Sequence, residues 1–405
     1  MSNWLIFGLL ANYICIAFVL IKWGNIRCTG ITPLKTPVFM AILFTSGWEV
    51  GVIMLPLVDF PRYEDFINYP EYSFTNPLAM EFASMAFAIW SGYFITCFYF
   101  CVIEPKVRFF KIPLVNLINT IVIVITCSFT IYLFLINLPI YTPELGDGKS
   151  LNAIFYLIVF LVISAAVYSS TNIRYVKILS MTSTILFFLL ISGMWIASFT
   201  IEKIAITQIF TSINLMSNYF LDLDKFLLPI NLYHEFYLYW WFSWYIMIGQ
   251  FLARFVGGIK TYQLFLMIMI IPSIPLGLWF SVIFIYYQNE ISTVGAYNLC
   301  MIFVGTLFVI NSLDSLIRLY TDNMNLTPKR LGQKKYIALN IFSLCLLTLM
   351  YNYDFLEIEW IGAIVVALFA ACLIYIFTMK FNTVRKIDSS PVENETNFEN
   401  SEIIS

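Results

Sequence analysis

Charged residues and histidine are scarce in this sequence. Only 11% of its 405 residues are charged, histidine occurs once, and 60% of the residues are hydrophobic. A soluble domain of this length could not bury so much apolar surface. The sequence also has no basic patch, which argues against nucleic-acid binding, and no cluster of catalytic or metal-ligating residues. We therefore expect an all-α polytopic membrane protein that is not an enzyme and needs no metal or cofactor.

Long apolar runs are what the sequence has instead. Eleven of them are long enough to cross about 30 Å of hydrocarbon, and they lie near residues 4–22, 37–58, 82–103, 114–137, 152–170, 178–199, 232–254, 263–287, 295–317, 335–352 and 358–379. Eighteen of the 22 Lys and Arg residues fall in the loops of one side. Because cytoplasmic loops carry the excess of Lys and Arg, we expect a multi-pass protein of the cell membrane, inner or plasma, with an external N-terminus and a cytoplasmic C-terminus.

The runs divide into two groups of five after the first is set aside. Residues 1–36 hold the extra N-terminal helix and a cytoplasmic loop, and the groups span residues 37–200 and 232–380. Five is odd, so the groups enter the membrane from opposite sides, which indicates the inverted repeat common in secondary transporters. Residues 201–231 are typical of an outer interfacial amphipathic segment. The polar, acidic residues 381–405 predict a disordered cytoplasmic tail.

The first helix of the first group carries a charge at mid-depth. Glu49 lies in the run Phe39–Phe60, between Gly47 and Gly51. A charge at the bilayer centre costs roughly 2.5–3.5 kcal/mol, so it normally faces a cavity or a partner. The two glycines loosen the helix there. We favour a substrate or ion site, and the alternative is a protonated glutamate bonded to a neighbouring helix.

The first helix of the second group carries aromatic rings at mid-depth. Tyr237, Trp240, Trp241 and Trp244 fall at i, i+3, i+4 and i+7, which is one helical face. Such a face can pack against other helices or line a pocket. The pocket suits a quaternary ammonium ion, which has no N–H donors but gains about 0.5–2 kcal/mol from each ring face.

Motifs along the chain are similar to those of one transporter family. Trp240-Trp241-Phe242-Ser243-Trp244 precedes Gly249 and Ala253-Arg254, and further matches are WGNIRC, FTSGWEVG with LVDF (Asp59-Phe60), IWSGY (Trp90, Tyr93) and FVINSLDS (Phe308–Ser315). On these residues the sequence resembles the betaine/choline/carnitine transporter family. It departs from the family in lacking the first helix, in having Glu49 in place of the middle glycine, and in having Met85 in place of a tryptophan.

The resemblance implies symport or another secondary transport of a small onium compound by alternating access. The implied substrate-binding residues are Trp240, Trp241, Trp244, Trp90, Tyr93, Tyr237, Glu49, Gly47, Trp48 and Gly51. Sodium-coupled relatives hold their ion at positions matching Thr45, Trp48, Phe308, Asn311 and Ser312, and the family is commonly trimeric. Glu49 would favour a purely cationic, choline-like substrate over a betaine. It could also bind a coupling proton in place of sodium.

Three further residues need an interpretation. Asp314 and Arg318 are four apart and predict a structural ion pair. Arg254 is expected to be a snorkelling anchor at the cytoplasmic surface. His234, at the outer end of its helix, is interpreted as a wetted boundary residue. It is also the one candidate base for the rival hypothesis of a membrane acyltransferase. A third alternative is a transporter-like sensor that binds its ligand without moving it.

Overall fold

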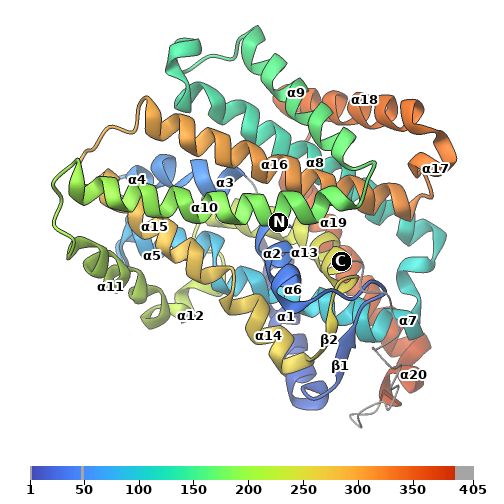
Figure 1. Cartoon of the computed structure of the whole chain (residues 1–405). Helices are drawn as coiled ribbons and strands as arrows, with labels where there is room; N and C mark the ends of the chain where they lie inside the picture. Colours follow the sequence, from blue (N-terminus) through green and yellow to red (C-terminus); the bar gives the residue numbers. More distant parts are fainter. Residues whose placement is uncertain (1, 47–49, 388–405) are drawn as a thin grey trace.

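The computed structural model describes residues 2–46 and 50–387, which are mainly helical (Figure 1). Gly47, Trp48 and Glu49 lie outside the described residues, as does the expected tail from residue 388. Their predicted roles are therefore not examined by the structure. The all-α expectation holds apart from one short pair of antiparallel strands, which sequence patterns did not indicate.

The helices and strands follow one another along the chain in two sets. The first set is α1 (Ser2–Trp23), β1 (Arg27–Thr29), α2 (Thr36–Ser46), α3 (Val50–Met54), α4 (Pro56–Glu64), η1 (Pro70–Tyr72), α5 (Pro77–Met85), η2 (Phe87–Ile89), α6 (Trp90–Phe98), η3 (Tyr99–Ile103), α7 (Glu104–Val107), η4 (Phe109–Lys111), α8 (Pro113–Tyr141), η5 (Pro143–Leu145), α9 (Ala153–Ser169) and α10 (Arg174–Thr200). The second set is α11 (Gln208–Leu221), α12 (Leu223–Phe226), α13 (Leu232–Ala253), β2 (Gly257–Lys260), α14 (Thr261–Ile270), α15 (Ser273–Gln288), α16 (Ala296–Asn323), α17 (Pro328–Leu331), α18 (Gln333–Asn352), α19 (Ile358–Tyr375), η6 (Ile376–Lys380) and α20 (Phe381–Arg385).

The lengths of these helices fit a membrane protein. Within residues 2–46 and 50–387, eight helical segments are long and apolar enough to cross a bilayer. The other three segments expected to cross are helical as well, as α2 to α4, α9 and α13. α9 has 17 residues, just short of a full span. α13 has 22 residues, but its many Tyr and Trp side chains lower its mean hydropathy.

Two of the long segments are broken near the middle. Asn76 caps α5 by accepting a hydrogen bond from the backbone N of Ala79 at 3.0 Å, and Pro77 occupies the first helical position. The segment then breaks before α6 at Phe87, whose φ of 45° is left-handed. The break between α14 and α15 falls at Pro272, which cannot donate a backbone hydrogen bond.

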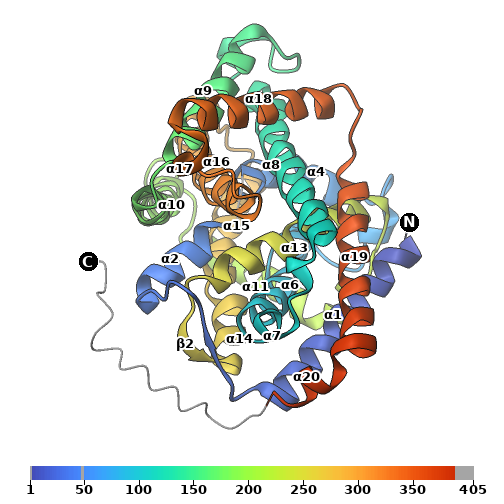
Figure 2. The same cartoon turned by 90° about the vertical axis from the view of Figure 1, so that its right-hand side faces the viewer.

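Helices of residues 37–200 pack on those of residues 232–380 in corresponding pairs. α8 packs against α16. α9 packs on α16 just as α18 packs on α8, and α10 packs on α2 and α16 just as α19 packs on α13 and α8. Figure 2 shows α13 near the centre, with α9 and α18 together at one edge and α1 and α20 at the opposite edge. The interior of the molecule is therefore built around α13.

The strands join the two loops that flank this interior. β1 pairs antiparallel with β2, with Arg27 opposite Lys260 and Cys28 opposite Ile259. The loop after β1 continues the contact, because the backbone N of Gly30 donates to the oxygen of Val256 at 2.9 Å. The loop ahead of α2 is thus held against the loop that leaves α13.

α6 and α13 pack closely because each helix has a glycine at the surface where the two helices meet. A Cβ added at Gly92 would lie 2.3 Å from the ring of Tyr245, and one at Gly249 would lie 2.0 Å from Oγ1 of Thr96. Thr96 donates its hydroxyl to the backbone oxygen of Tyr245 at 2.7 Å. Small residues at such crossings let helix backbones approach closely in membranes.

Gly249→Ala is expected to lower the free energy of unfolding by about 1–3 kcal/mol, because the added methyl group overpacks the contact between α6 and α13. Thermal unfolding of the purified protein in detergent measures the change. Gly193→Ala is the matched control on α10, where an added Cβ meets nothing within 4 Å, and alanine there should be neutral or stabilising. Equal effects of the two substitutions would contradict this account of the contact.

Candidate functional site

The N-terminal end of α13 is held by a polar cap. Asn231 accepts from the backbone N of His234 at 2.9 Å and from the hydroxyl of Tyr72 at 3.1 Å, and its amide donates to Glu71 at 2.5 Å. Ser2 donates to Glu235 at 2.6 Å. These bonds tie the start of α1 and the loop after α4 to α13, and so fix the register of its aromatic face.

The aromatic face of α13 is fully buried. Tyr237, Trp240, Trp241 and Trp244 are each exposed by 1% or less. The rings of Trp240 and Trp241 stack at 5.3 Å with an interplanar angle of 11°, and Tyr237 lies 5.5 Å from Trp240. Because two rings stacked at that distance already touch, a guest would have to contact the outer faces of the pair rather than lie between its members.

Indole N–H groups distinguish the three tryptophans. Trp241 donates to the backbone oxygen of Ser84 on α5 at 2.6 Å. The Nε1–H groups of Trp240 and Trp244 have no acceptor among the described residues. Buried donors without an acceptor are rare in folded proteins, and a polar ligand is one explanation for them.

Trp90 and Tyr93 form a second aromatic group on α6. Their rings lie 5.1 Å apart in an edge-to-face arrangement, and Tyr93 lies 5.7 Å from Tyr245 of α13. Gly51, another residue implied by the resemblance, lies against Trp240, because an added Cβ would be 2.7 Å from that ring. The structure thus packs the aromatic candidates inside the molecule in two groups. Their role in binding stays a prediction.

Two carboxyl groups lie beside this aromatic face. Asp59 on α4 accepts hydrogen bonds from the hydroxyls of Tyr233, at 2.5 Å, and Tyr237. Arg62 lies 3.7 Å from the centroid of the Tyr233 ring. Glu81 on α5 is fully buried, and neither of its carboxyl oxygens has a hydrogen-bond partner among residues 2–46 and 50–387.

Hydropathy alone does not place Glu81 in a helix, because the apolar run of the sequence begins at residue 82. On that boundary the residue falls in a loop. The helix in fact begins at Pro77, and the preceding Asn76 is a typical N-cap. The Asn-Pro pair was the signal that could have placed Glu81 inside the helix.

The proposed ion-coupling residues are brought together between α2 and α16. The backbone oxygen of Thr45 accepts from the amide of Asn311 at 3.3 Å and the hydroxyl of Ser312 at 3.4 Å. Ser180 of α10 donates to the other side of Asn311 at 3.2 Å. Phe308 packs at 6.2 Å from Phe44. These polar groups already form hydrogen bonds among themselves and with Ser180, so their role as sodium ligands stays a prediction.

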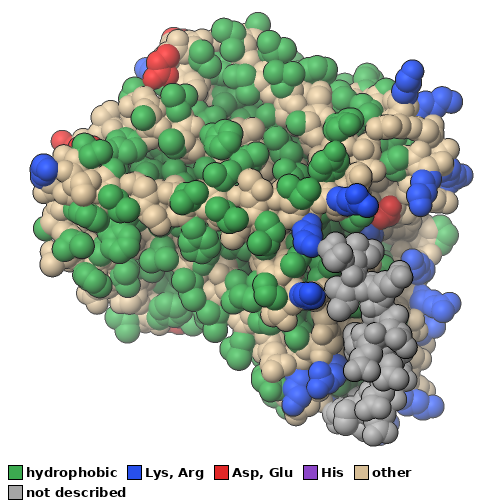
Figure 3. All heavy atoms as spheres, viewed as in Figure 1, with side chains coloured by type: hydrophobic (Ala, Val, Ile, Leu, Met, Phe, Trp, Pro, Cys, Tyr) green, Lys and Arg blue, Asp and Glu red, His purple; other side chains and the backbone are tan. Residues whose placement is uncertain are grey.

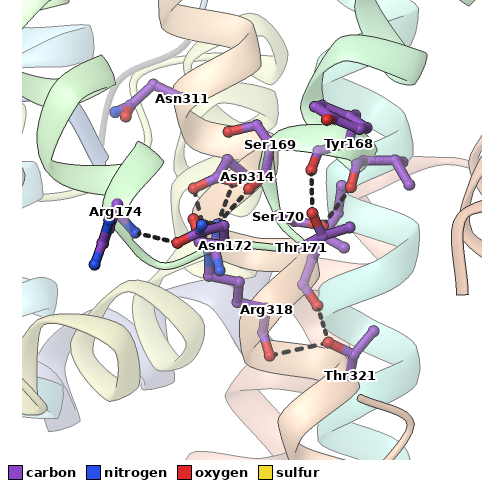
Figure 4. Close-up of polar contacts among 12 residues, drawn as sticks. Tyr168, Ser169, Ser170, Thr171, Asn172, Arg174, Asn311, Asp314, Arg318 and Thr321 are labelled. Carbon is purple, nitrogen blue, oxygen red and sulfur yellow. Dashed lines mark hydrogen bonds and ion pairs between the residues drawn. The ribbon is translucent and has the colours of Figure 1, made fainter. Parts of the chain in front are cut away.

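The expected pair of Asp314 and Arg318 is present as an ion pair of 2.9 Å (Figure 4). Asp314 is fully buried. Arg318 also donates at 2.6 Å to each of the backbone oxygens of Ser169 and Asn172, where the chain leaves α9. The pair therefore joins α16 to the end of α9.

Two other interpretations change. His234 is not a wetted boundary residue, because it is 1% exposed and its Nδ1 accepts from the backbone N of Ile230 at 3.2 Å. That bond occupies one nitrogen in closing the turn ahead of α13. Arg254 does more than anchor a helix, because it forms a 2.8 Å ion pair with Asp322 at the end of α16.

A cavity of about 720 Å³ lies beside that ion pair, at the end of α13 away from His234. Arg254, Asp322 and Gln250 are among its lining residues. Gln250 bonds Asn119 of α8 at 3.1 Å and Asn323 of α16 at 3.2 Å. This polar bridge lies between Arg254 and the aromatic face along α13, and Trp244 is about 9 Å along the helix from Gln250.

Comparison with known proteins adds no assignment. No family model matches the chain, and no curated protein matches it.

Proposed function

We propose that the protein is a secondary transporter of a small organic cation of the quaternary-ammonium class, such as choline, working by alternating access. The observation that carries the proposal is the buried contact between aromatic rings and acids. Tyr237 lies against Trp240 and donates to Asp59. Ring faces attract a desolvated cation, and the carboxylate supplies the opposite charge. Ring faces together with a carboxylate would not stabilise a neutral or anionic ligand to a comparable extent.

The paired packing of helices supports a five-plus-five inverted repeat. The halves correspond if α2 to α4 match α13, the broken segment α5 to α7 matches α14 and α15, and α8, α9 and α10 match α16, α18 and α19. Each of the contacts described above then has a counterpart in the other half. Transporters of this plan bind substrate where the first helices of the two halves meet. Here Gly51 of the first half lies against Trp240 of the second.

The distribution of charge supports the proposed orientation. Lys and Arg side chains gather at the right-hand end of the molecule in Figure 3, the end at which α7, α17 and α20 lie in Figure 1. Ser2 at the start of α1 bonds Glu235 in the first turn of α13, which is the end of α13 away from Arg254. By the positive-inside rule the N-terminus is external.

The cavity and its polar bridge suggest a route to the cytoplasm. The cavity lies at the end of α13 that carries Arg254, and a change in the bonds of Gln250 would connect it to the aromatic face. On the outer side, Asp59 and its tyrosines link α4 to α13. Alternating access would require these two barriers to open in turn.

Binding of choline to the purified protein, measured by tryptophan fluorescence, tests the proposal. We expect choline to change the emission, because Trp240 and Trp241 are buried next to the proposed site. The neutral isostere 3,3-dimethyl-1-butanol is the matched control, since it has the same shape without the charge. Betaine and carnitine complete the set, with and without sodium. An equal response to the neutral isostere would rule out recognition of a cation.

Uptake of labelled choline into proteoliposomes separates the transporter from its rivals. A sensor would bind choline without accumulating it inside the vesicles. His234→Ala should leave uptake intact, although the loss of one capping hydrogen bond should cost about 1 kcal/mol of stability. If that variant instead lost all function while it remained folded, the acyltransferase hypothesis would gain support.

A further inference from the structure

Glu81 is a carboxyl group in an environment that disfavours its charged form. It lies on α5, fully buried, and among the residues that the structure describes no donor reaches either carboxyl oxygen. An ionised carboxylate without donors is very costly in a low-dielectric interior. Asp59 is equally buried but receives two tyrosine hydroxyls.

The charges near Glu81 determine which acid carries the proton. Glu81 interacts electrostatically with Asp59 and Tyr63 on α4, with Tyr141 on α8 and with Tyr237 on α13, and Asp59 in turn faces Arg62, Tyr233 and Tyr237. Glu81 and Asp59 are close enough for their charges to repel. Two neighbouring carboxyl groups in such a site cannot both ionise while no cation is bound between them. Asp59 has the donors and the nearby arginine, so the proton belongs on Glu81.

Glu81 is also placed beside the aromatic face. Ser84 is three residues further along α5 and therefore shares a helical face with Glu81. Its backbone oxygen accepts the indole N–H of Trp241, and its hydroxyl lies 3.4 Å from that of Tyr63. The face of α5 that carries Glu81 is thus the one turned toward Trp241 and α4.

We infer that Glu81 is a proton-binding site whose proton is displaced by the organic cation, so that the protein exchanges one cation for one proton. This rests on the proposed function. When the cation arrives, the O–H bond of Glu81 breaks, the proton leaves to the aqueous phase on that side, and the carboxylate neutralises the cation. On the other side the cation departs and Glu81 takes up a proton again. The net charge of the occupied site is the same in both states.

A proton explains Glu81 better than a metal ion. A hard cation needs several oxygen ligands around it, and no oxygen of the described residues bonds either carboxyl oxygen of Glu81. Nor do three His, Cys, Asp or Glu side chains gather as ligands anywhere within residues 2–46 and 50–387. A protonated carboxylic acid needs no such ligand shell.

The first test is the pH dependence of choline affinity. Competition between one proton and one cation makes the apparent Kd for choline rise about tenfold for each unit by which the pH falls below the midpoint of Glu81. Glu81→Gln imitates the protonated acid and should fold normally. This variant should bind choline more weakly than the wild type, and its affinity for choline should not change with pH. Glu81→Asp should restore the pH dependence. A wild-type affinity that is independent of pH, or an unchanged slope in Glu81→Gln, would overturn the inference.

Glu235→Gln is the matched control for these measurements. Glu235 is 9% exposed and lies on α13, but it has a partner in the hydroxyl of Ser2. Its substitution should leave the pH dependence of choline affinity as in the wild type. If Glu235→Gln abolished the slope instead, the proton would not belong to Glu81.

The direction of the driving gradient distinguishes exchange from symport. Proteoliposomes with an interior more acidic than the medium should accumulate choline, because outward proton movement drives the cation inward. A symporter would accumulate choline with the opposite gradient. Accumulation that requires an acidic medium, or one that requires inward sodium, would overturn the exchange.

An infrared measurement tests the proton on Glu81 without any substrate. The wild-type protein should show an absorption band of a protonated carboxyl group that is missing in Glu81→Gln and present in Glu235→Gln. If the two variants have the same spectrum, the inference fails even if choline is transported. If the band behaves as expected but no onium compound binds, the transport proposal fails, and the exchange fails with it.

Discussion

Arg318→Ala is expected to lower the free energy of unfolding by about 3–5 kcal/mol, the cost of leaving a buried charge without its partner. Asp314 is fully buried, and its ion pair with Arg318 is 2.9 Å long. The substitution also removes the donor to the backbone oxygens of Ser169 and Asn172. Thermal unfolding in detergent should show a large fall in Tm, and the connection between α16 and the end of α9 should loosen first.

Two controls separate the buried charge from loss of the side chain. Arg254→Ala breaks an ion pair whose side chains are 24% and 45% exposed, and pairs at such exposure contribute only about 0–1 kcal/mol. Adding Asp314→Asn to Arg318→Ala removes the unpaired charge and should recover part of the lost stability. If Arg254→Ala and Arg318→Ala were equally destabilising, burial of Asp314 would not be the cause.

Local sequence patterns anticipated the features of this molecule that depend on neighbours within one helix. The spacing of Asp314 and Arg318 predicted their pair, and the spacing from Tyr237 to Trp244 predicted a shared face. The same spacing could not reveal that Arg318 also holds Ser169 and Asn172, because α9 and α16 are brought together only by tertiary packing. The pairing of β1 with β2 was equally hidden, since each strand has only three or four residues.

Errors in helix boundaries had the largest consequence for the site. A start at residue 82 rather than Pro77 left Glu81 in a loop, whereas the structure buries it in a helix. His234 was placed at a wetted boundary for a similar reason, because hydropathy says nothing of the loops that cover a helix end. The contact of Thr45 with Asn311 and Ser312 was anticipated only through the family resemblance. The spacing of residues around Thr45 and around Asn311 does not predict that these two segments are in contact.

The face of α13 also shows a limit of spacing arguments. Trp240 and Trp241 are adjacent in the sequence, yet their rings are nearly parallel and stacked. Side-chain rotamers decide this, and they follow from the surroundings: Gly51 makes room for Trp240, and Ser84 accepts the N–H of Trp241. The helical face alone would have allowed several arrangements of the two rings.

This arrangement leads to the second large effect. Replacing Trp240 and Trp241 together by leucine is expected to weaken choline binding by about 1–4 kcal/mol, because each ring face contributes roughly 0.5–2 kcal/mol to a bound cation. The apparent Kd should then rise between about fivefold and several hundredfold. The apparent Kd is measured by binding of labelled choline in detergent, because tryptophan fluorescence would lose the signal of the two replaced tryptophans. Trp360→Leu is the control, because that tryptophan is 47% exposed on α19 and should leave the affinity unchanged.

Loss of packing could imitate this result, so stability and affinity must be compared in the same variants. Leucine in place of two buried tryptophans should lower the Tm, whereas Trp240→Phe with Trp241→Phe keeps two ring faces and should keep most of the affinity. Affinity that follows the presence of a ring rather than the Tm identifies attraction between the cation and the rings. If the phenylalanine and leucine variants lost affinity equally, or if affinity fell only in proportion to stability, the aromatic face of α13 would be a packing surface and the proposed transport of an onium compound would lose its main support.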